Sequence, residues 1–178
     1  MTTETVRLAE LEPRCSTAEA LAFFDALPGV NADELNGRWR GRELATGHPM
    51  DGVLEASGWY GKQFDSVDAV HPLLFEAPDG DIFPVDPRRL PIGLAGKVPL
   101  SAVEVGRRGL GVAKTVLRTS KHRARLRNVE HRGAVSAAMV YDHLPVIDHF
   151  RRVDDDTLLG TMDQRGAAEP YFFILARD

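Results

Sequence analysis

The stretch Gly37-Arg38-Trp39-Arg40-Gly41 decides the fold that we predict for this chain of 178 residues. A glycine-flanked tryptophan at the start of the first strand, which we place over residues 34–44, is typical of an antiparallel barrel that an indole closes at one end. Such a barrel encloses a mostly apolar interior. The sequence therefore favours a protein that binds a lipid or another small hydrophobic molecule.

The last third of the chain supports the same architecture, because apolar runs alternate there with turns. We expect five strands, over residues 123–130, 134–141, 146–152, 157–162 and 172–177. The connections are so short that neighbouring strands must be antiparallel. Three earlier strands would complete a closed sheet, and closure removes exposed edges. The sequence thus predicts a mainly β chain, an antiparallel barrel with added helices, and a β-sandwich is the alternative.

The expected helices precede these strands. Ser16 and Glu19 form a capping box that begins an amphipathic helix, and Pro28-Gly29 ends it. The turn at residues 47–52 leads into a helical insertion that includes Trp59 and Lys62. After it we expect a hairpin of residues 71–77 and 81–85, a loop over residues 86–99, and a helix over residues 110–119.

Composition and charge limit the classes of function. The net charge of −4 and the sequence pI near 5.9 argue against general nucleic-acid binding, which usually needs a basic excess. Cys15 is the only cysteine, so no intramolecular disulfide and no multi-cysteine metal site can form. The N-terminus lacks the apolar core of a signal peptide, and no stretch has the length of a membrane span. We therefore expect a cytoplasmic protein with no integral membrane segment, and leave a homo-oligomer open.

Several separated motifs agree in order with one bacterial family. After Gly37–Gly41 come Gly47-His48-Pro49-Met50-Asp51-Gly52, Ser57-Gly58-Trp59-Tyr60-Gly61-Lys62, Val70-His71-Pro72-Leu73, Tyr141-Asp142-His143-Leu144-Pro145-Val146-Ile147-Asp148-His149-Phe150 and Asp155-Asp156-Thr157-Leu158-Leu159-Gly160-Thr161-Met162-Asp163. Through these motifs the chain resembles the GXWXG family, in which an N-terminal GXWXG segment is joined to a C-terminal domain of unknown function. The resemblance covers residues 31–178 and implies no particular activity.

A looser similarity connects the chain with calycins, the group of lipocalins, fatty-acid-binding proteins and nitrobindins. In that group a Gly-X-Trp near the first strand often meets an arginine from the last strand. Trp39 and Arg177 are placed for such a cation–π closure. The similarity implies one calycin-like barrel domain over residues 1–178. Within it we distinguish an N-terminal helix region (1–30), the GXWXG segment (31–98), and a C-terminal helix with a β-meander (99–178).

The pairs Asp142-His143 and Asp148-His149 are the strongest candidates for chemistry. If the chain stayed extended through Pro145, both aspartates would share one strand face and both histidines the other. A carboxylate aimed into an apolar interior shifts toward its neutral form, so it could bind a polar head group or act as general acid and base. The alternative is structural, with hydrogen bonds to hairpin amides or ion pairs with Arg151 and Arg152.

A second group of side chains falls in the helical insertion: His48, Asp51, Trp59, Tyr60, Lys62 and His71. Aromatic rings with a few polar tips suit the mouth of an apolar pocket, although Trp59 and Tyr60 also fit plain core packing. From both groups and the surrounding motifs we predict these ligand-binding residues: Trp59, Tyr60, Tyr141, Asp142, Asp148 and His149. No residue is assigned as catalytic.

The sequence predicts no metal site and no cofactor. Its six histidines are scattered, with no His-X-His or His-X-X-X-His pair. The run Asp154-Asp155-Asp156 lacks the glycine and the distal glutamate of a calcium loop, and a Gly-X-Ser-X-Gly elbow is absent. Haem held by one axial histidine inside the barrel leaves no spacing signature, and it stays an alternative.

The leading hypothesis is binding of a lipid or other small hydrophobic ligand in the barrel cavity. The main alternative is an enzyme, such as a cyclase, isomerase or hydrolase, that acts on an apolar small molecule through buried aspartate and histidine groups. Haem or nitric-oxide chemistry is a third hypothesis. A barrel that serves only in protein interactions is the fourth, and it would have no large pocket.

Overall fold

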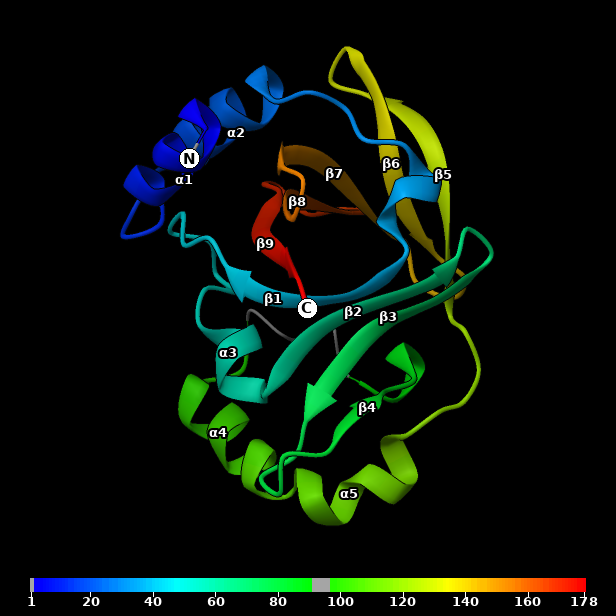
Figure 1. Cartoon of the computed structure of the whole chain (residues 1–178). Coiled ribbons are helices and arrows are strands. Elements are labelled where there is room, and N and C mark those ends of the chain that lie inside the picture. Colours follow the sequence, from blue (N-terminus) through cyan, green and yellow to red (C-terminus); the bar gives the residue numbers. More distant parts are fainter. Residues whose placement is uncertain (1, 91–96) are drawn as a thin grey trace.

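Nine strands form one antiparallel sheet in the part of the chain that the structure, a computed structural model, describes: residues 2–90 and 97–178 (Figure 1). The sheet order is β2-β1-β9-β8-β7-β6-β5-β3-β4, and β2 also pairs with β3. Every strand except β4 therefore belongs to a closed ring, which confirms the predicted fold class. The strands are β1 (Gly37–Glu43), β2 (Trp59–Ser66), β3 (Ala69–Glu76), β4 (Ile82–Pro84), β5 (Ala124–His131), β6 (Ala134–Tyr141), β7 (Val146–Asp154), β8 (Thr157–Gln164) and β9 (Tyr171–Arg177).

The ring has one weak seam, between β3 and β5. These strands share the single residue pair Val70 with Ala124, whereas β5 and β6 pair along eight residues. Two backbone hydrogen bonds support the seam: the Arg123 amide donates to the Val70 carbonyl at 2.9 Å, and the Leu126 amide donates to the Val67 carbonyl at 2.7 Å. Little backbone hydrogen bonding therefore closes the barrel at this point.

The helices α1 (Thr3–Leu11) and α2 (Thr17–Ala26) lie against the outside of the barrel (Figure 1). The predicted capping box begins α2: the Ser16 hydroxyl accepts from the Glu19 amide at 3.2 Å, and the Glu19 carboxylate accepts from the Ser16 amide at 2.8 Å. Both helices pack on outward-facing residues of β7, β8 and β9, and so build a second core. Its main members are Leu8, Leu11, Phe24, Val153, Leu159, Phe172 and Ile174.

Trp39 belongs to the inner core of the barrel. Its side chain is 1% exposed, and Nε1 donates to the carbonyl oxygen of Leu35 at 2.8 Å. The guanidinium carbon of Arg177 lies 4.3 Å from the centroid of the Trp39 ring, as the cation–π closure requires. Buried side chains from the whole ring of strands pack in the same core: Phe64, Leu126, Met139, Phe150, Leu158 and Leu175.

Three helices lie on the side of the molecule away from α1 and α2: α3 (Val53–Ser57), α4 (Leu100–Arg108) and α5 (Leu110–Leu117) (Figure 1). α5 coincides with the helix predicted over residues 110–119. The sequence did not predict α1, which buries only Leu8 and Leu11, or α4, which has no fully buried residue. Each of these helices has only nine residues, so a helical repeat of apolar positions has little length in which to show. In the described ranges, no helix is both long and apolar enough to cross a membrane.

Three expected elements need correction. β1 begins at Gly37 rather than near residue 34, because Ala32–Leu35 forms a 3-10 helix. The helical insertion ends at Ser57, since Gly58 adopts a left-handed conformation with φ of 83°, and Trp59–Ser66 is a strand instead. The expected loop over residues 86–99 contains the 3-10 helix Pro87–Arg89, and its residues 91–96 lie outside the described residues. The hairpin after residue 70 is confirmed as β3 and β4.

Candidate functional site

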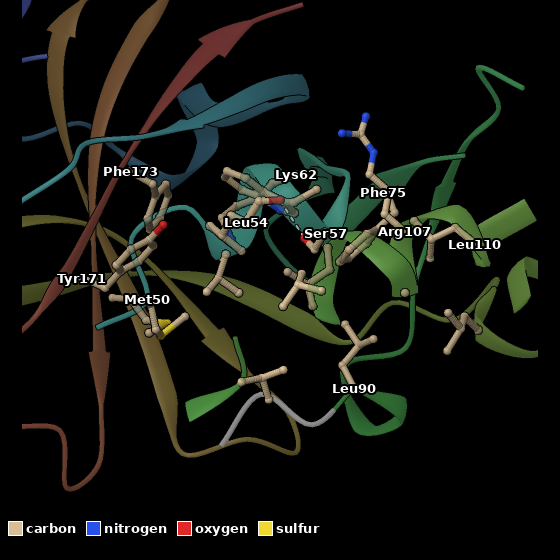
Figure 2. Close-up of a pocket in the computed structure, with 18 of the residues that line it drawn as sticks. Met50, Leu54, Ser57, Lys62, Phe75, Leu90, Arg107, Leu110, Tyr171 and Phe173 are labelled. Atoms are coloured by element: carbon tan, nitrogen blue, oxygen red, sulfur yellow. Dashed lines mark hydrogen bonds between the residues drawn. The ribbon is translucent and has the colours of Figure 1, made fainter. Parts of the chain in front are cut away.

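A cavity of about 390 Å³ lies between the barrel and the helices α3, α4 and α5 (Figure 2). Met50, Tyr171 and Phe173 gather at one side of it in Figure 2, and Arg107 and Leu110 lie at the other. Its walls are almost entirely apolar. The barrel strands contribute Trp59, Lys62, Leu73, Phe75, Tyr141, Asp148, Met162, Tyr171 and Phe173.

A buried ion pair is the main polar feature of this cavity. Nζ of Lys62 donates to Oδ2 of Asp148 at 2.8 Å and to the carbonyl oxygen of Pro72 at 3.2 Å. The two charged side chains are only 3% and 2% exposed. Burial raises the pKa of Asp148 above its ordinary value, and the charge of Lys62 opposes that rise. The nearby ammonium of Lys62 therefore favours the ionised form of the Asp148 carboxyl, which burial disfavours.

Aromatic rings surround the Lys62 ammonium. Nζ lies 5.0 Å from the ring centroid of Phe173, 5.7 Å from that of Trp59 and 5.8 Å from that of Tyr141. The faces of such rings stabilise a cation where water is excluded. Burial, together with the nearby Asp148, raises the pKa of the Tyr141 phenol well above its ordinary value. The phenol therefore stays protonated and remains a hydrogen-bond donor.

Three residues that line the cavity each have a buried polar atom with unused hydrogen-bonding capacity. Among the described residues, Oδ1 of Asp148, Nε1 of Trp59 and the Tyr171 hydroxyl have no hydrogen-bond partner. A buried polar atom without a partner costs roughly 1–3 kcal/mol, so native proteins keep few of them. The carboxylate oxygen accepts hydrogen bonds, the indole nitrogen donates one, and the phenol hydroxyl can do either. A hydroxyl group both donates and accepts, so it could pair with atoms of either kind.

Half of the predicted ligand-binding residues line the cavity, namely Trp59, Tyr141 and Asp148. Tyr60 does not. Its hydroxyl donates to Oδ2 of Asp178 at 2.8 Å, and the guanidinium groups of Arg38 and Arg40 lie over its ring. Because neighbouring strand residues face opposite sides of a sheet, Trp59 and Tyr60 cannot both point into the barrel. The prediction for Tyr60 is therefore corrected.

Asp142 and His149 also lie outside the cavity. β6 ends at Tyr141 and β7 begins at Val146, and the tight turn between them breaks the extended register that the sequence analysis assumed. Asp142 is exposed in this turn, with Oδ1 3.4 Å from the Arg125 guanidinium. His149 points to the outer side of the barrel, stacked on His131 with ring centroids 3.7 Å apart. The turn thus separates residues that a continuous strand would have aligned.

The second predicted group is dispersed, and of its polar members only Lys62 reaches the cavity. The His48 ring packs 5.3 Å from the Tyr171 ring, and Asp51 accepts two hydrogen bonds from amides of its own turn. His71 lies on the outer face of β3, outside the cavity lining. Sequence reasoning did not single out Tyr171 and Phe173 as cavity residues. Aromatic residues at alternate positions where β9 begins are the signal that could have identified them.

Residues 22–80 match the GXWXG protein family, and residues 122–177 match a domain of unknown function, DUF4334. A crystal structure of a protein from Thermomonospora curvata is 34% identical to this chain, and the match covers 99% of both chains with a TM-score of 0.74. The chain belongs to the GXWXG family. The resemblance to the GXWXG family, with its C-terminal domain of unknown function, is thereby confirmed. No curated protein matches this GXWXG chain.

The structure explains the glycines of the GXWXG motif. Gly37 has a φ of 116°, which side chains other than that of glycine rarely adopt. A Cβ atom at Gly41 would lie 2.1 Å from Cη2 of Trp59, so only glycine leaves room for that indole. Gly41 therefore admits the indole of Trp59 to the cavity wall. In this way the second glycine of the GXWXG motif shapes the cavity.

Proposed function

We propose that this GXWXG protein binds a small hydrophobic molecule that carries one polar group. The observation that supports the proposal most is the Lys62–Asp148 pair, enclosed by an otherwise apolar cavity. A buried ion pair is costly to desolvate and is weak evidence for added stability. Recognition of a ligand's polar group would explain why this ion pair is present in a cavity with aromatic walls. The apolar part of the ligand would contact α3, α4 and α5, and its polar group would meet the ion pair.

The size and lining of the cavity support a small ligand. Its volume of about 390 Å³ falls at the lower end of the roughly 300–1,000 Å³ that is typical of ligand pockets. Such pockets bind mainly by apolar contact, and a few polar groups fix the orientation of the ligand. Here the free Oδ1 of Asp148 and the free Nε1 of Trp59, within the described residues, favour a hydroxyl as that group.

A titration with decane, 1-decanol and decanoate tests the proposal, because the three probes share a chain and differ in their polar end. Trp59 lies in the cavity wall, so its fluorescence reports binding. We expect 1-decanol to bind at least tenfold more tightly than decane, since its hydroxyl can bond to Asp148 and Trp59. Equal affinities for all three probes would contradict the claim that the site recognises a polar group. Failure of every probe to bind would contradict the proposed function.

Two glycines of the covering helices provide a matched pair of variants. Gly106 of α4 lines the cavity, whereas Gly111 of α5 does not, and a Cβ atom added at either position would meet open space. We expect Gly106→Trp to weaken binding of 1-decanol at least tenfold by filling the cavity. Gly111→Trp should leave the affinity unchanged. An equal effect of the two substitutions would place the binding site elsewhere.

Acid–base catalysis on an apolar substrate is a second candidate function, favoured by the raised pKa of Asp148 and its free carboxylate oxygen. Asp148 lines the cavity, whereas His149, the histidine that the enzyme hypothesis also uses, does not. Asp148→Asn distinguishes the two functions. A carrier should keep most of its affinity for decane, while an acid–base enzyme should lose about 10²–10⁴-fold in turnover.

The other two hypotheses receive less support. No histidine occurs among the described residues that line the cavity, so haem would lack its axial ligand there. A barrel that serves only in protein interactions would not need an apolar cavity with an ion pair in its wall. Addition of hemin to the apoprotein, followed by absorbance near the Soret band, checks the haem hypothesis directly.

A further inference from the structure

We propose that Asp65, His71 and His122 bind a divalent transition-metal ion of the Zn²⁺ type on the outer surface of the barrel. These residues come from three separate segments: Asp65 from β2, His71 from β3, and His122 from the segment just before β5. They are absent from the cavity lining as far as the structure describes it. The proposed metal site is therefore independent of the proposed ligand site.

The side chains already converge. One ligand atom from each residue lies within 4.8 Å of the other two. Nε2 of His122 is 2.9 Å from Oδ2 of Asp65, and Nε2 of His71 is 4.0 Å from the same oxygen. The two imidazole rings lie beside each other, with centroids 4.5 Å apart. Two imidazoles thus flank one carboxylate oxygen.

This donor set and its spacing suit a first-row transition metal. Zn²⁺ binds histidine nitrogen and carboxylate oxygen at about 2.0–2.2 Å, which places neighbouring ligand atoms of a tetrahedron about 3.5 Å apart. The two distances to Asp65 lie on either side of that value, so small side-chain rotations would complete the site. Two histidines with one carboxylate are also a known set for divalent iron. Three protein ligands would leave a coordination position for water.

The surroundings hold the carboxylate in place. Nε2 of Gln63 donates to Oδ1 of Asp65 at 2.8 Å, which leaves Oδ2 directed at the two imidazoles. Outer partners of this kind orient metal ligands in many sites. The His71 side chain is 14% exposed, while those of Asp65 and His122 are 41% and 39% exposed. One ligand is therefore fixed by packing, and the other two remain accessible to an ion from solvent.

The position of the cluster gives the metal a structural effect. His71 follows Val70, which forms the single residue pair that joins β3 to β5. His122 lies two residues before Ala124, the other member of that pair. An ion bound to both histidines would cross-link the barrel at its weak seam. The ion would also cross-link the two ends of the long segment that contains β4, α4 and α5. Closing a long loop reduces the conformational entropy of the unfolded chain more than closing a short one.

Isothermal titration of the untagged, chelator-treated chain with ZnCl₂ tests the proposal. We expect one Zn²⁺ per chain and a higher melting temperature in its presence. His122→Ala should reduce the affinity at least tenfold and abolish the rise in melting temperature, and His71→Gln should do the same. His122 is exposed, so its substitution spares the fold. His143→Ala, at an exposed histidine in the β6–β7 turn, is the matched control.

Co²⁺ provides a second readout, because its visible spectrum reports coordination by protein ligands. The wild type should show d–d bands that Asp65→Asn weakens and His143→Ala leaves intact. Absence of Zn²⁺ binding by the wild type would overturn the proposal. Binding that survives both His71→Gln and His122→Ala unchanged would overturn it too, and would show that the three residues form only a hydrogen-bonded cluster.

Discussion

Nζ of Lys62 and Oδ2 of Asp148 lie 2.8 Å apart, and both belong to the wall of an apolar cavity. β2 supplies the ammonium and β7 the carboxylate, two strands that are not neighbours in the ring. The pair therefore spans the interior of the barrel. Both charges are buried, so removal of either one would leave the other as an unpaired charge in an apolar environment, which is strongly destabilising.

The first prediction concerns this coupling. Lys62→Met should lower the free energy of unfolding by about 3–5 kcal/mol, because it leaves the Asp148 carboxylate buried without its partner. The double variant Lys62→Met/Asp148→Leu should recover most of that loss, since it removes both charges. Urea denaturation of the wild type, Lys62→Met, Asp148→Leu and the double variant measures the coupling energy between the two residues. Additive losses would show that the two charges do not depend on each other.

A second prediction compares the two tryptophans. Nε1 of Trp39 donates to the Leu35 carbonyl, whereas Nε1 of Trp59 has no partner among the described residues. Trp39→Phe should therefore destabilise the fold by about 1–3 kcal/mol more than Trp59→Phe, because it leaves a buried carbonyl without a donor. Chemical denaturation gives both values. If the two substitutions cost the same, the Trp39 hydrogen bond contributes nothing to stability.

The third prediction concerns the second glycine of the motif. Gly41→Ala should displace the Trp59 indole, since the added methyl group would lie 2.1 Å from its ring. We expect a shifted tryptophan emission maximum and at least tenfold weaker binding of 1-decanol. Gly111→Ala is the control, because a Cβ atom there meets open space. A wild-type emission spectrum and affinity for Gly41→Ala would show that the backbone moves instead of the indole.

A fourth prediction follows from the titration of His149. Burial, reinforced by the stacked His131, lowers the pKa of His149 from its ordinary 6.5 to about 4. The unfolded chain therefore binds the proton more readily than the folded chain between these two pH values. Stability should be complete above pH 6.5 and should fall as the pH approaches about 4, by up to about 3 kcal/mol.

Unfolding measured from pH 7 to pH 4 checks this prediction. His149→Phe should flatten the profile relative to the wild type, because its ring cannot bind a proton. His143→Ala should leave the profile unchanged, since His143 is exposed. An identical pH dependence of wild type and His149→Phe would assign the acid sensitivity to other groups.

Alternation of apolar residues and turn signals were enough to predict the C-terminal strands. β6 coincides with the predicted residues 134–141, and the other four differ from the predictions only by a few residues at their ends. The turn at residues 142–145 shows where such reasoning stops. The pattern of a strand shows which residues share a face of the sheet. The geometry of the preceding tight turn decides which of the two faces of the next strand points into the barrel. Asp148 was therefore placed correctly, and Asp142 was not.

The candidate sites were harder to predict because their parts come from distant segments. Lys62 meets Asp148 only once the barrel closes, and the histidines of the proposed metal site are separated by β4 and two helices. The residues of neither site are close enough in the sequence to form a recognisable motif. Gly61 adds to the difficulty: its φ of 153° accompanies a register shift in β2, so the apolar alternation that marks a strand is interrupted.

α4 helps to cover the cavity and yet contributes no fully buried side chain. Most costly substitutions act on tightly packed positions, so changes along α4 leave the barrel largely unaffected. If the cavity binds a ligand, as proposed, substitutions along this one short helix would alter the shape of the binding site while the nine-stranded sheet keeps its fold.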